Sequence, residues 1–230
     1  MADSGEAPTQ APGYKRCMTK NLEQDAGRAA RANAAFYDVF LSLAERRGMR
    51  ARRRALLADA RGRVLEIGAG TGLNLEHYPA AVTELVLAEP EDGMRARLAG
   101  RVAGSGRAAT VISDGAEHLP FGDDSFDCVV STMVLCTVED PEAAAAELRR
   151  VLRPDGRLLF IEHVRADDAR LARWQDRLET PWRLFAEGCR CNRPTLDVLT
   201  GAGLTAQRLV RDEWRGMPAI VHPLVIGEAA

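Results

Sequence analysis

Five short apolar runs, each bounded by Gly, Pro or Asp and separated by stretches of helical periodicity, constrain this chain more than any other feature. These runs cover residues 63–67, 84–88, 110–113, 128–132 and 157–161. Strands that alternate with helical crossovers build a parallel sheet with helices on both faces. Two further runs, 206–210 and 220–226, predict two more strands. The sequence therefore predicts an α/β fold.

The length and composition bound the domain organisation and the kind of partner. The chain has 230 residues, of which 46% are hydrophobic and 28% charged. This length supports one sizeable core, so we expect a single domain over residues 21–230. Residues 1–20 mix Pro, Gly, Ser and charge without a period, which predicts a disordered tail. A formal charge of -2 gives no general attraction to nucleic acid or anionic lipid, so a small molecule is the expected partner.

The sequence has the features of a cytoplasmic protein. No apolar run approaches the roughly 18 residues that cross a bilayer, and the first residues are too polar for a secretory signal. Five cysteines without framework spacing suit a reducing compartment. We therefore predict a cytoplasmic monomer or homodimer without a membrane span.

Helical stretches lie before, between and after the predicted strands. Residues 21–59 carry apolar side chains at helical spacing among many charges, which predicts one or two amphipathic helices. Residues 141–152 predict an alanine-rich helix, with 154–156 as its stop and turn. Residues 165–193 form an insertion after the fifth run, in which Thr180-Pro181 is expected to restart the helix. Because open α/β sheets bind ligands at the carboxyl ends of their strands, we interpret this insertion as a lid.

A glycine-rich stretch follows the first apolar run. In residues 68–72 the side chains are small, so that a ligand can approach the main chain at the expected start of a helix. This turn predicts a nucleoside cofactor. The dinucleotide fingerprint needs its third glycine at the position of Leu73, so the motif disfavours NAD. Glu66 would suit a cationic amino group, and Glu89 at the end of the second run offers acceptors for two ribose hydroxyls.

In combination these motifs resemble those of the class I S-adenosylmethionine-dependent methyltransferases. The matching stretches are 66–72, Glu89, 114–121, 126–130 and 152–156. The resemblance implies a Rossmann-like, seven-stranded, mostly parallel sheet, with S-adenosylmethionine as the methyl donor. It places the loop glycines under the methionine and ribose, and residues 114–117 beside the adenine. The donor-binding residues that it implies are Glu66, Gly68, Ala69, Gly70, Thr71, Gly72, Asn74, Glu89, Pro90, Asp114, Gly115, Ala116, Glu117, Met133 and Leu135.

A closer resemblance is to the small-molecule thiol S-methyltransferases. It is carried by residues 133–138, 162–164, 181–182, 184–185 and 188–189. It implies a small apolar acceptor, with a thiol sulfur as the favoured methylated atom. The acceptor-binding residues that it implies are Tyr37, Cys136, His163, Trp182, Phe185 and Cys189.

The chemistry of methyl transfer draws attention to side chains just after the fourth and fifth runs. A thiol reacts as its thiolate, so a nearby base or positive field helps at neutral pH. His163 directly follows the fifth run and Cys136 follows the fourth, so both are expected to face one crevice. We take His163 as the candidate base or substrate-orienting group, with a structural, hydrogen-bonded histidine as the alternative. Cys136 is the second catalytic candidate, although a buried thiol more commonly serves packing.

Two other clusters are interpreted structurally. Cys189-Arg190-Cys191 has neither a second cysteine pair nor the spaced histidines of a zinc site, so no metal is predicted. The arginines between positions 46 and 54 are balanced by acidic residues and lack interleaved aromatic residues. That pattern favours a solvated helix face over a nucleic-acid site.

The sequence thus predicts an S-adenosylmethionine-dependent methyltransferase, and three alternatives stay open. One is an O- or C-methyltransferase of quinone or secondary-metabolite type. Another is a catalytically silent module that binds S-adenosylmethionine. The third is a nicotinamide dehydrogenase, which Leu73 disfavours.

Overall fold

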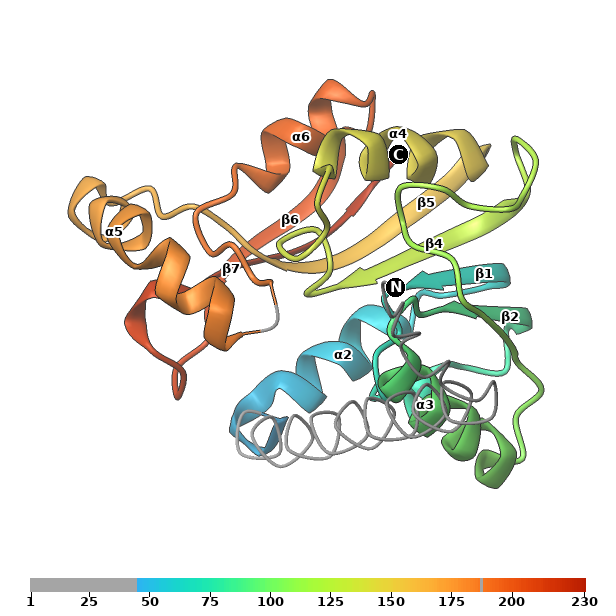
Figure 1. The fold of residues 1–230 in the computed structure, drawn as a ribbon. Helices are drawn as coiled ribbons and strands as arrows, with labels where there is room; N and C mark the ends of the chain where they lie inside the picture. Colours follow the sequence, from blue (N-terminus) through green and yellow to red (C-terminus); the bar gives the residue numbers. More distant parts are fainter. Residues whose placement is uncertain (1–44, 187) are drawn as a thin grey trace, which may run out of the picture.

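The computed structural model describes residues 45–186 and 188–230, and its centre is a seven-stranded sheet (Figure 1). The strands are β1 (Gly62–Ile67), β2 (Val82–Ala88), β3 (Thr110–Ile112), β4 (Phe126–Thr132), β5 (Leu152–His163), β6 (Ala206–Glu213) and β7 (Pro223–Ala229). Their order is β3-β2-β1-β4-β5-β7-β6. β1 to β5 are parallel, and β7 is antiparallel to both of its neighbours. This is the mostly parallel, Rossmann-like sheet that the sequence predicts.

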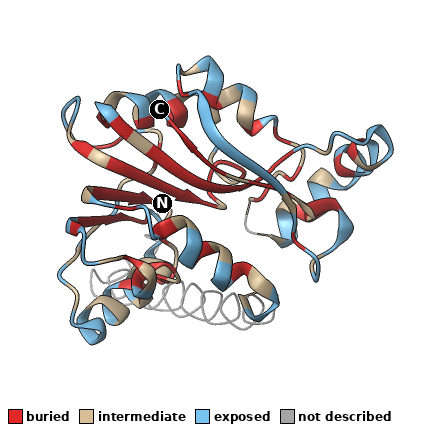
Figure 2. Ribbon diagram, turned by 180° about the vertical axis from the view of Figure 1, so that it is seen from behind, coloured by how far each residue is buried: buried red, intermediate tan, exposed pale blue. Residues whose placement is uncertain are grey.

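Helices cover both faces of the sheet. The helices within the described residues are η1 (Glu45–Met49), α2 (Arg50–Leu57), η2 (Leu75–His77), α3 (Asp92–Ser105), α4 (Pro141–Val151), α5 (Ala169–Phe185), α6 (Thr195–Gly201) and η3 (Ala219–Val221). α2 and α3 lie on one face, and α4 and α6 lie on the other (Figure 1). The central strands are therefore buried on both sides, as Figure 2 shows, which explains why they are continuously apolar.

Alternating side chains of the central strands β1, β2, β4 and β5 contribute to two separate core clusters. Leu65 and Ile67 of β1 pack on the side of α4, against residues such as Leu148. Val64 packs on the opposite side with Leu57 of α2 and Leu98 of α3. This period of two is the reason why one strand can bind two helical layers.

Two local predictions are corrected by the structure. α5 is continuous through Pro181, so the expected restart at Thr180-Pro181 is wrong. The proline removes one backbone hydrogen bond, to the carbonyl of Arg177, and that residue is exposed to water. The predicted stop at residues 154–156 lies inside β5, where pairing jumps from Leu152 to Arg157 and the residues between them bulge out.

The N-terminal region is described only in part. η1 and α2 are the portion of the predicted helical segment 21–59 that the structure describes. The predicted tail and Tyr37 lie outside the described residues. Among the helices that the structure does describe, none is long and apolar enough to cross a membrane.

Candidate active site

The glycine loop, residues 68–72, leaves the carboxyl end of β1 and is held against β2. The amide of Ala69 donates to the carbonyl of Ala88 at 2.9 Å. The amide of Gly70 donates to Oε2 of Glu89 at 2.7 Å. β1 also lies beside β4, where the strand order reverses. Open α/β sheets bind their ligands at such a switch point, outside the carboxyl ends of the strands.

The three loop glycines have different structural roles. All have positive φ, at 52° for Gly68, 56° for Gly70 and 89° for Gly72. A Cβ at Gly68 would lie 2.6 Å from Val134, and one at Gly72 would lie 2.8 Å from Leu98. At Gly70 the nearest atom would be 3.9 Å away. Packing therefore requires the outer two glycines, whereas Gly70 leaves free space beside the main chain for a ligand.

Glu89 is a buried carboxylate next to that free space. Its Oε1 accepts a hydrogen bond from the amide of Glu91 at 2.9 Å, while Oε2 accepts the one from Gly70. Burial raises the pKa of Glu89, although the two amide donors oppose that rise. Each oxygen keeps a second acceptor position, so the carboxylate can still receive two hydroxyl groups.

Glu66 lies beneath the loop rather than open to a ligand. Its Oε1 accepts from Asn74 at 2.8 Å and its Oε2 from the Tyr78 hydroxyl at 2.6 Å. Burial raises the pKa of Glu66 to about 7, against the lowering effect of those two hydrogen bonds. The same two hydrogen bonds hold residues 74–78 close to the carboxyl end of β1. Only the 3-10 helix η2 follows the loop, so the predicted helix start at this place is wrong.

Arg53 is a site residue that the sequence interpretation missed. It is 6% exposed, and its Nη1 donates to Oδ1 of Asn74 and to Oγ1 of Thr132, both at 3.0 Å. Its Nε donates to Glu45 at 3.1 Å. The arginine run is therefore not a uniformly solvated face. No local signal separates Arg53 from its neighbours, because only the tertiary packing of α2 buries it.

The remaining predicted donor residues lie along the same edge. Thr71 and Asn74 are buried, and Pro90 is exposed after β2. The stretch 114–117 follows β3, with Ala116 buried and Glu117 accepting a hydrogen bond from the amide of Glu139 at 3.0 Å. Residues 114–117 thus lie after β3, which is the next strand beyond β2 in the sheet.

The segment from Met133 to Cys136 joins the glycine loop to the next part of the site. Met133 has φ of 62°, an uncommon conformation for a residue with a side chain. Val134 contacts the loop at Gly68, and its amide donates to Oε1 of the buried Glu162 at 3.1 Å. Leu135 is buried in the core. Strain of this kind persists where the surrounding structure fixes it, and it concentrates at functional sites.

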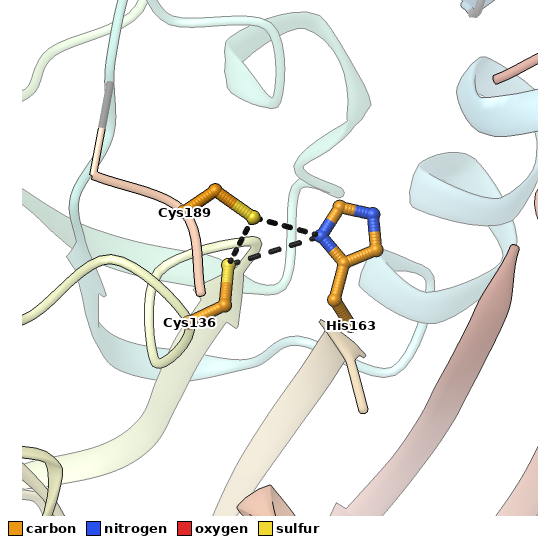
Figure 3. A group of neighbouring side chains, drawn as sticks. All are labelled: Cys136, His163 and Cys189. Carbon is orange, nitrogen blue, oxygen red and sulfur yellow. Dashed lines mark hydrogen bonds between the residues drawn. The ribbon is translucent and has the colours of Figure 1, made fainter. Parts of the chain in front are cut away.

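Cys136, His163 and Cys189 form a compact cluster, hereafter the Cys-His-Cys cluster (Figure 3). They come from the loop after β4, the end of β5 and the loop after α5. The Sγ atoms of the two cysteines are 3.7 Å apart. Nδ1 of His163 is 3.8 Å from Sγ of Cys136 and 3.6 Å from Sγ of Cys189. The structure thus brings Cys136 and His163 together, as the sequence predicts, and their role as site residues stays a prediction.

The cluster is buried and electrostatically asymmetric. The exposed fractions are 1% for Cys136, 5% for His163 and 6% for Cys189. The hydrogen bond between the sulfurs, supported by His163, lowers the pKa of Cys189, and the same bond together with burial raises the pKa of Cys136. The two loops are tied by the amide of Arg190, which donates to the Cys136 carbonyl at 2.8 Å.

Aromatic side chains surround the cluster. Trp182 of α5 packs with Cys136 and Cys189 in an apolar group that includes Ile220 and Val221. The ring of Trp214 stacks on His163, with centroids 5.4 Å apart. Phe185 reaches the edge of this group, since its ring centroid lies 5.8 Å from that of Trp182, but it is 60% exposed and is not a member of the buried group.

These features fit S-adenosylmethionine. A cationic adenosyl ligand needs bare backbone, supplied at Gly70, and an acceptor pair for its ribose, supplied by the buried Glu89. The fold and this site define a class I S-adenosylmethionine-dependent methyltransferase.

Comparisons with known proteins agree that the protein is a methyltransferase. A family model described as a methyltransferase domain matches residues 65–160. The chain is 33% identical over 183 residues to the thiol S-methyltransferase TMT1B of Homo sapiens, covering 75% of this chain and 73% of the relative. The chain therefore belongs to the family of S-adenosylmethionine-dependent methyltransferases that includes this relative.

Two further similarities place the family in context. A demethylmenaquinone methyltransferase of Clavibacter sepedonicus is 38% identical over 109 residues, covering 47% of this chain and 44% of that protein. The crystal structure of an S-adenosylmethionine-dependent methyltransferase from Thermotoga maritima superposes with a TM-score of 0.66. The superposition covers 87% of this chain and 96% of the Thermotoga chain. The sequences are 22% identical, so the similarity shows a shared fold.

Proposed function

We propose that this protein transfers the methyl group of S-adenosylmethionine to the sulfur of a small apolar thiol. The observation that carries the proposal is the extent of its similarity to thiol S-methyltransferases. The human relative aligns over 183 residues, far more than the domain match at 65–160, so the similarity continues outside the donor-binding part. The quinone-type relative aligns over only 109 residues.

The donor side of the proposal uses the glycine loop. S-adenosylmethionine supplies a methyl group that its sulfonium sulfur activates for substitution. We assign the ribose hydroxyls to Glu89 and the methionine part to the open main chain at Gly70. Glu66 and Arg53 support the loop from below through Asn74, and Arg53 provides positive charge near the amino acid end. Residues 114–117 border the adenine.

The acceptor side uses the Cys-His-Cys cluster. We assign His163 and Cys136 to the acceptor step, in which they hold the acceptor sulfur at the sheet edge and favour its thiolate form. The apolar residues around them, such as Ile220 and Val221, suit an apolar acceptor. Because the methyl transfer depends on alignment and on excluding water, a dry pocket serves it well.

Helix α5 is the lid in this proposal. It lies beyond the carboxyl end of β5, apart from the helices that cover the sheet faces (Figure 1). Its inner side chain Trp182 packs against Cys136 and Cys189. Closure over the bound acceptor would then expel water from the reacting atoms.

The second candidate is an O- or C-methyltransferase of quinone type, which the 38% identity to demethylmenaquinone methyltransferase favours. Incubation of the purified protein with S-adenosylmethionine and a matched panel of thiols, phenols and quinols separates the two. We expect mass increases of one methyl group on thiols. Methylation of phenols or quinols alone would refute the thiol assignment, and donor binding without any product would indicate the silent module.

A further inference from the structure

The geometry points to a zinc site: we propose that Cys136, His163 and Cys189 bind one Zn²⁺ ion and leave one coordination position open. These residues are distant in sequence, and their three ligand atoms lie within 4.8 Å of one another. Cys189-Arg190-Cys191 alone lacks the spacing of a zinc site. In the structure, the partners of Cys189 come from two other segments of the chain (Figure 3).

The three distances match the edges of a zinc tetrahedron. With Zn–S of about 2.3 Å and Zn–N of about 2.0 Å, tetrahedral angles place two sulfurs about 3.8 Å apart and sulfur and nitrogen about 3.5 Å apart. The observed separations are 3.7 Å between the sulfurs, and 3.8 and 3.6 Å from the sulfurs to Nδ1. One ion at the centre of these atoms would therefore need little rearrangement.

The supporting contacts hold the ligands in this arrangement. The guanidinium of Arg193 donates to the carbonyls of Leu135 and Val138, which fixes the loop that carries Cys136. The Arg190 amide ties the Cys189 loop to the same segment. Trp214 stacks on the His163 ring and sets its plane. Preorganised ligands of this kind favour metal binding, because the side chains lose little conformational entropy when the ion binds.

The donor set selects the metal. Two sulfurs and one imidazole nitrogen are ligands that Zn²⁺ accepts readily, whereas Mg²⁺ and Ca²⁺ require oxygen. Within residues 45–186 and 188–230, the cluster has three members rather than four. Zinc sites with three protein ligands keep a fourth position for water or substrate, so this site has the form of a reactive centre rather than a purely structural one.

The open position suits an acceptor thiol, a step that rests on the proposed function. The thiol would bind zinc as a thiolate and release its proton to solvent. Its sulfur would then form a bond to the methyl carbon, while the bond from that carbon to the donor sulfur breaks and leaves its electron pair on the donor. The methylated acceptor and the demethylated donor each carry an uncharged thioether sulfur. A thioether is a weaker zinc ligand than a thiolate, so the methylated acceptor would leave the ion.

The metal is tested with Co²⁺ as a spectroscopic probe. The purified, reduced protein is treated with chelator and titrated with Co²⁺, and then with Zn²⁺. We expect one equivalent of Co²⁺ with thiolate charge-transfer bands and a tetrahedral spectrum, displaced by Zn²⁺. X-ray absorption of the zinc-loaded wild type should show two sulfurs at about 2.3 Å. A zinc shell of nitrogen and oxygen alone, or no saturable band, would overturn the site.

Variants test the ligand assignment. Cys189→Ser should weaken Zn²⁺ binding by at least about 100-fold, because one thiolate ligand is lost. Cys191→Ser is the matched control, since Cys191 is buried two positions away and is not in the cluster. Equal losses in both variants would refute the assignment. If Cys189→Ser does not fold, the X-ray absorption of the wild type still decides. A Cys136–Cys189 disulfide, with no zinc uptake after reduction, would also contradict the proposal.

Different results would refute the binding of thiolate at the open zinc position and the proposed function. Addition of a small apolar thiol to the Co²⁺-loaded protein should change the charge-transfer bands. Zinc binding with no methylation of any thiol would keep the site and refute the function. Undiminished thiol methylation by the metal-free protein would keep the function and refute the thiolate position on zinc.

Discussion

The donor side and the acceptor side of this site are built in different ways. The donor side is nearly continuous in sequence, since the glycine loop and Glu89 stand at the ends of neighbouring strands β1 and β2. The acceptor side is assembled from three distant segments that meet only in the folded protein. The segment 133–136 joins the two, because Val134 packs on Gly68 while Cys136 enters the cluster. A local motif can therefore reveal the donor, whereas the acceptor chemistry depends on tertiary structure.

The largest expected effect separates the two sides at the acceptor. His163→Ala should lower the rate of methyl transfer by about two to three orders of magnitude, because it removes the imidazole that faces both sulfurs. Donor affinity, measured by calorimetry, should stay the same. His118→Ala is the control, since His118 is exposed. An unchanged rate in His163→Ala would make that histidine purely structural.

The matching change on the donor side is Glu89→Ala. We expect donor affinity to fall about 100-fold, because the ribose loses both acceptor oxygens and the loop loses its bond at Gly70. Glu84→Ala, at an exposed position of β2, the strand that precedes Glu89, should bind the donor normally. Equal affinity of the two variants for S-adenosylmethionine would show that the ribose binds elsewhere.

The glycine loop itself can be divided by stability measurements. Gly68→Ala should lower the free energy of unfolding by about 2–4 kcal/mol, through positive φ and the clash with Val134. Adding Val134→Ala should recover part of that loss. A Cβ at Gly70 would approach no other residue closer than 3.9 Å, so Gly70→Ala should cost less stability than Gly68→Ala but reduce donor binding. Equal destabilisation by both alanines would contradict the division of roles.

Glu66 makes a pH-dependent contribution. Its pKa is raised from 4.5 to about 7 in the folded state, so the folded protein holds this proton while the unfolded chain has released it. Stability should therefore fall as pH rises from about 5 to 7, by on the order of 1–2 kcal/mol. Denaturant titrations of wild type and Glu66→Gln check this, because the variant should show a flatter profile. Equal slopes would show that Glu66 is ionised throughout.

The smallest effect concerns Phe185 and Trp182, two of the three aromatic residues of α5. Phe185→Ala should change the rate of methyl transfer by less than about twofold, because its side chain lies outside the cluster. Trp182→Ala should reduce the rate more strongly, since it opens the apolar wall beside Cys136 and Cys189. Steady-state kinetics on one acceptor compare the two. A larger loss for Phe185→Ala would reverse our view of which side faces the acceptor.

The predictable part of this molecule is the part encoded by local pattern. Apolar runs predicted the seven strands to within about five residues at each end, and the order of strand, glycine loop and acid predicted S-adenosylmethionine as the methyl donor. What failed depends on tertiary contacts. The segment after the glycine loop forms the short helix η2 in place of the expected helix start, and the residues on either side of η2, Asn74 and Tyr78, donate hydrogen bonds to the buried Glu66. The burial of Arg53 and the approach of Cys189 to His163 involve residues too far apart for any periodicity to relate.

The choice of methylated atom is the central claim, and one acceptor tests it directly. A mercaptophenol carries a thiol and a hydroxyl on the same apolar ring, so both compete for one pocket. Incubation with S-adenosylmethionine and product identification by fragmentation mass spectrometry should find the methyl group on sulfur. Methyl transfer to the oxygen, with the thiol left free, would contradict the account.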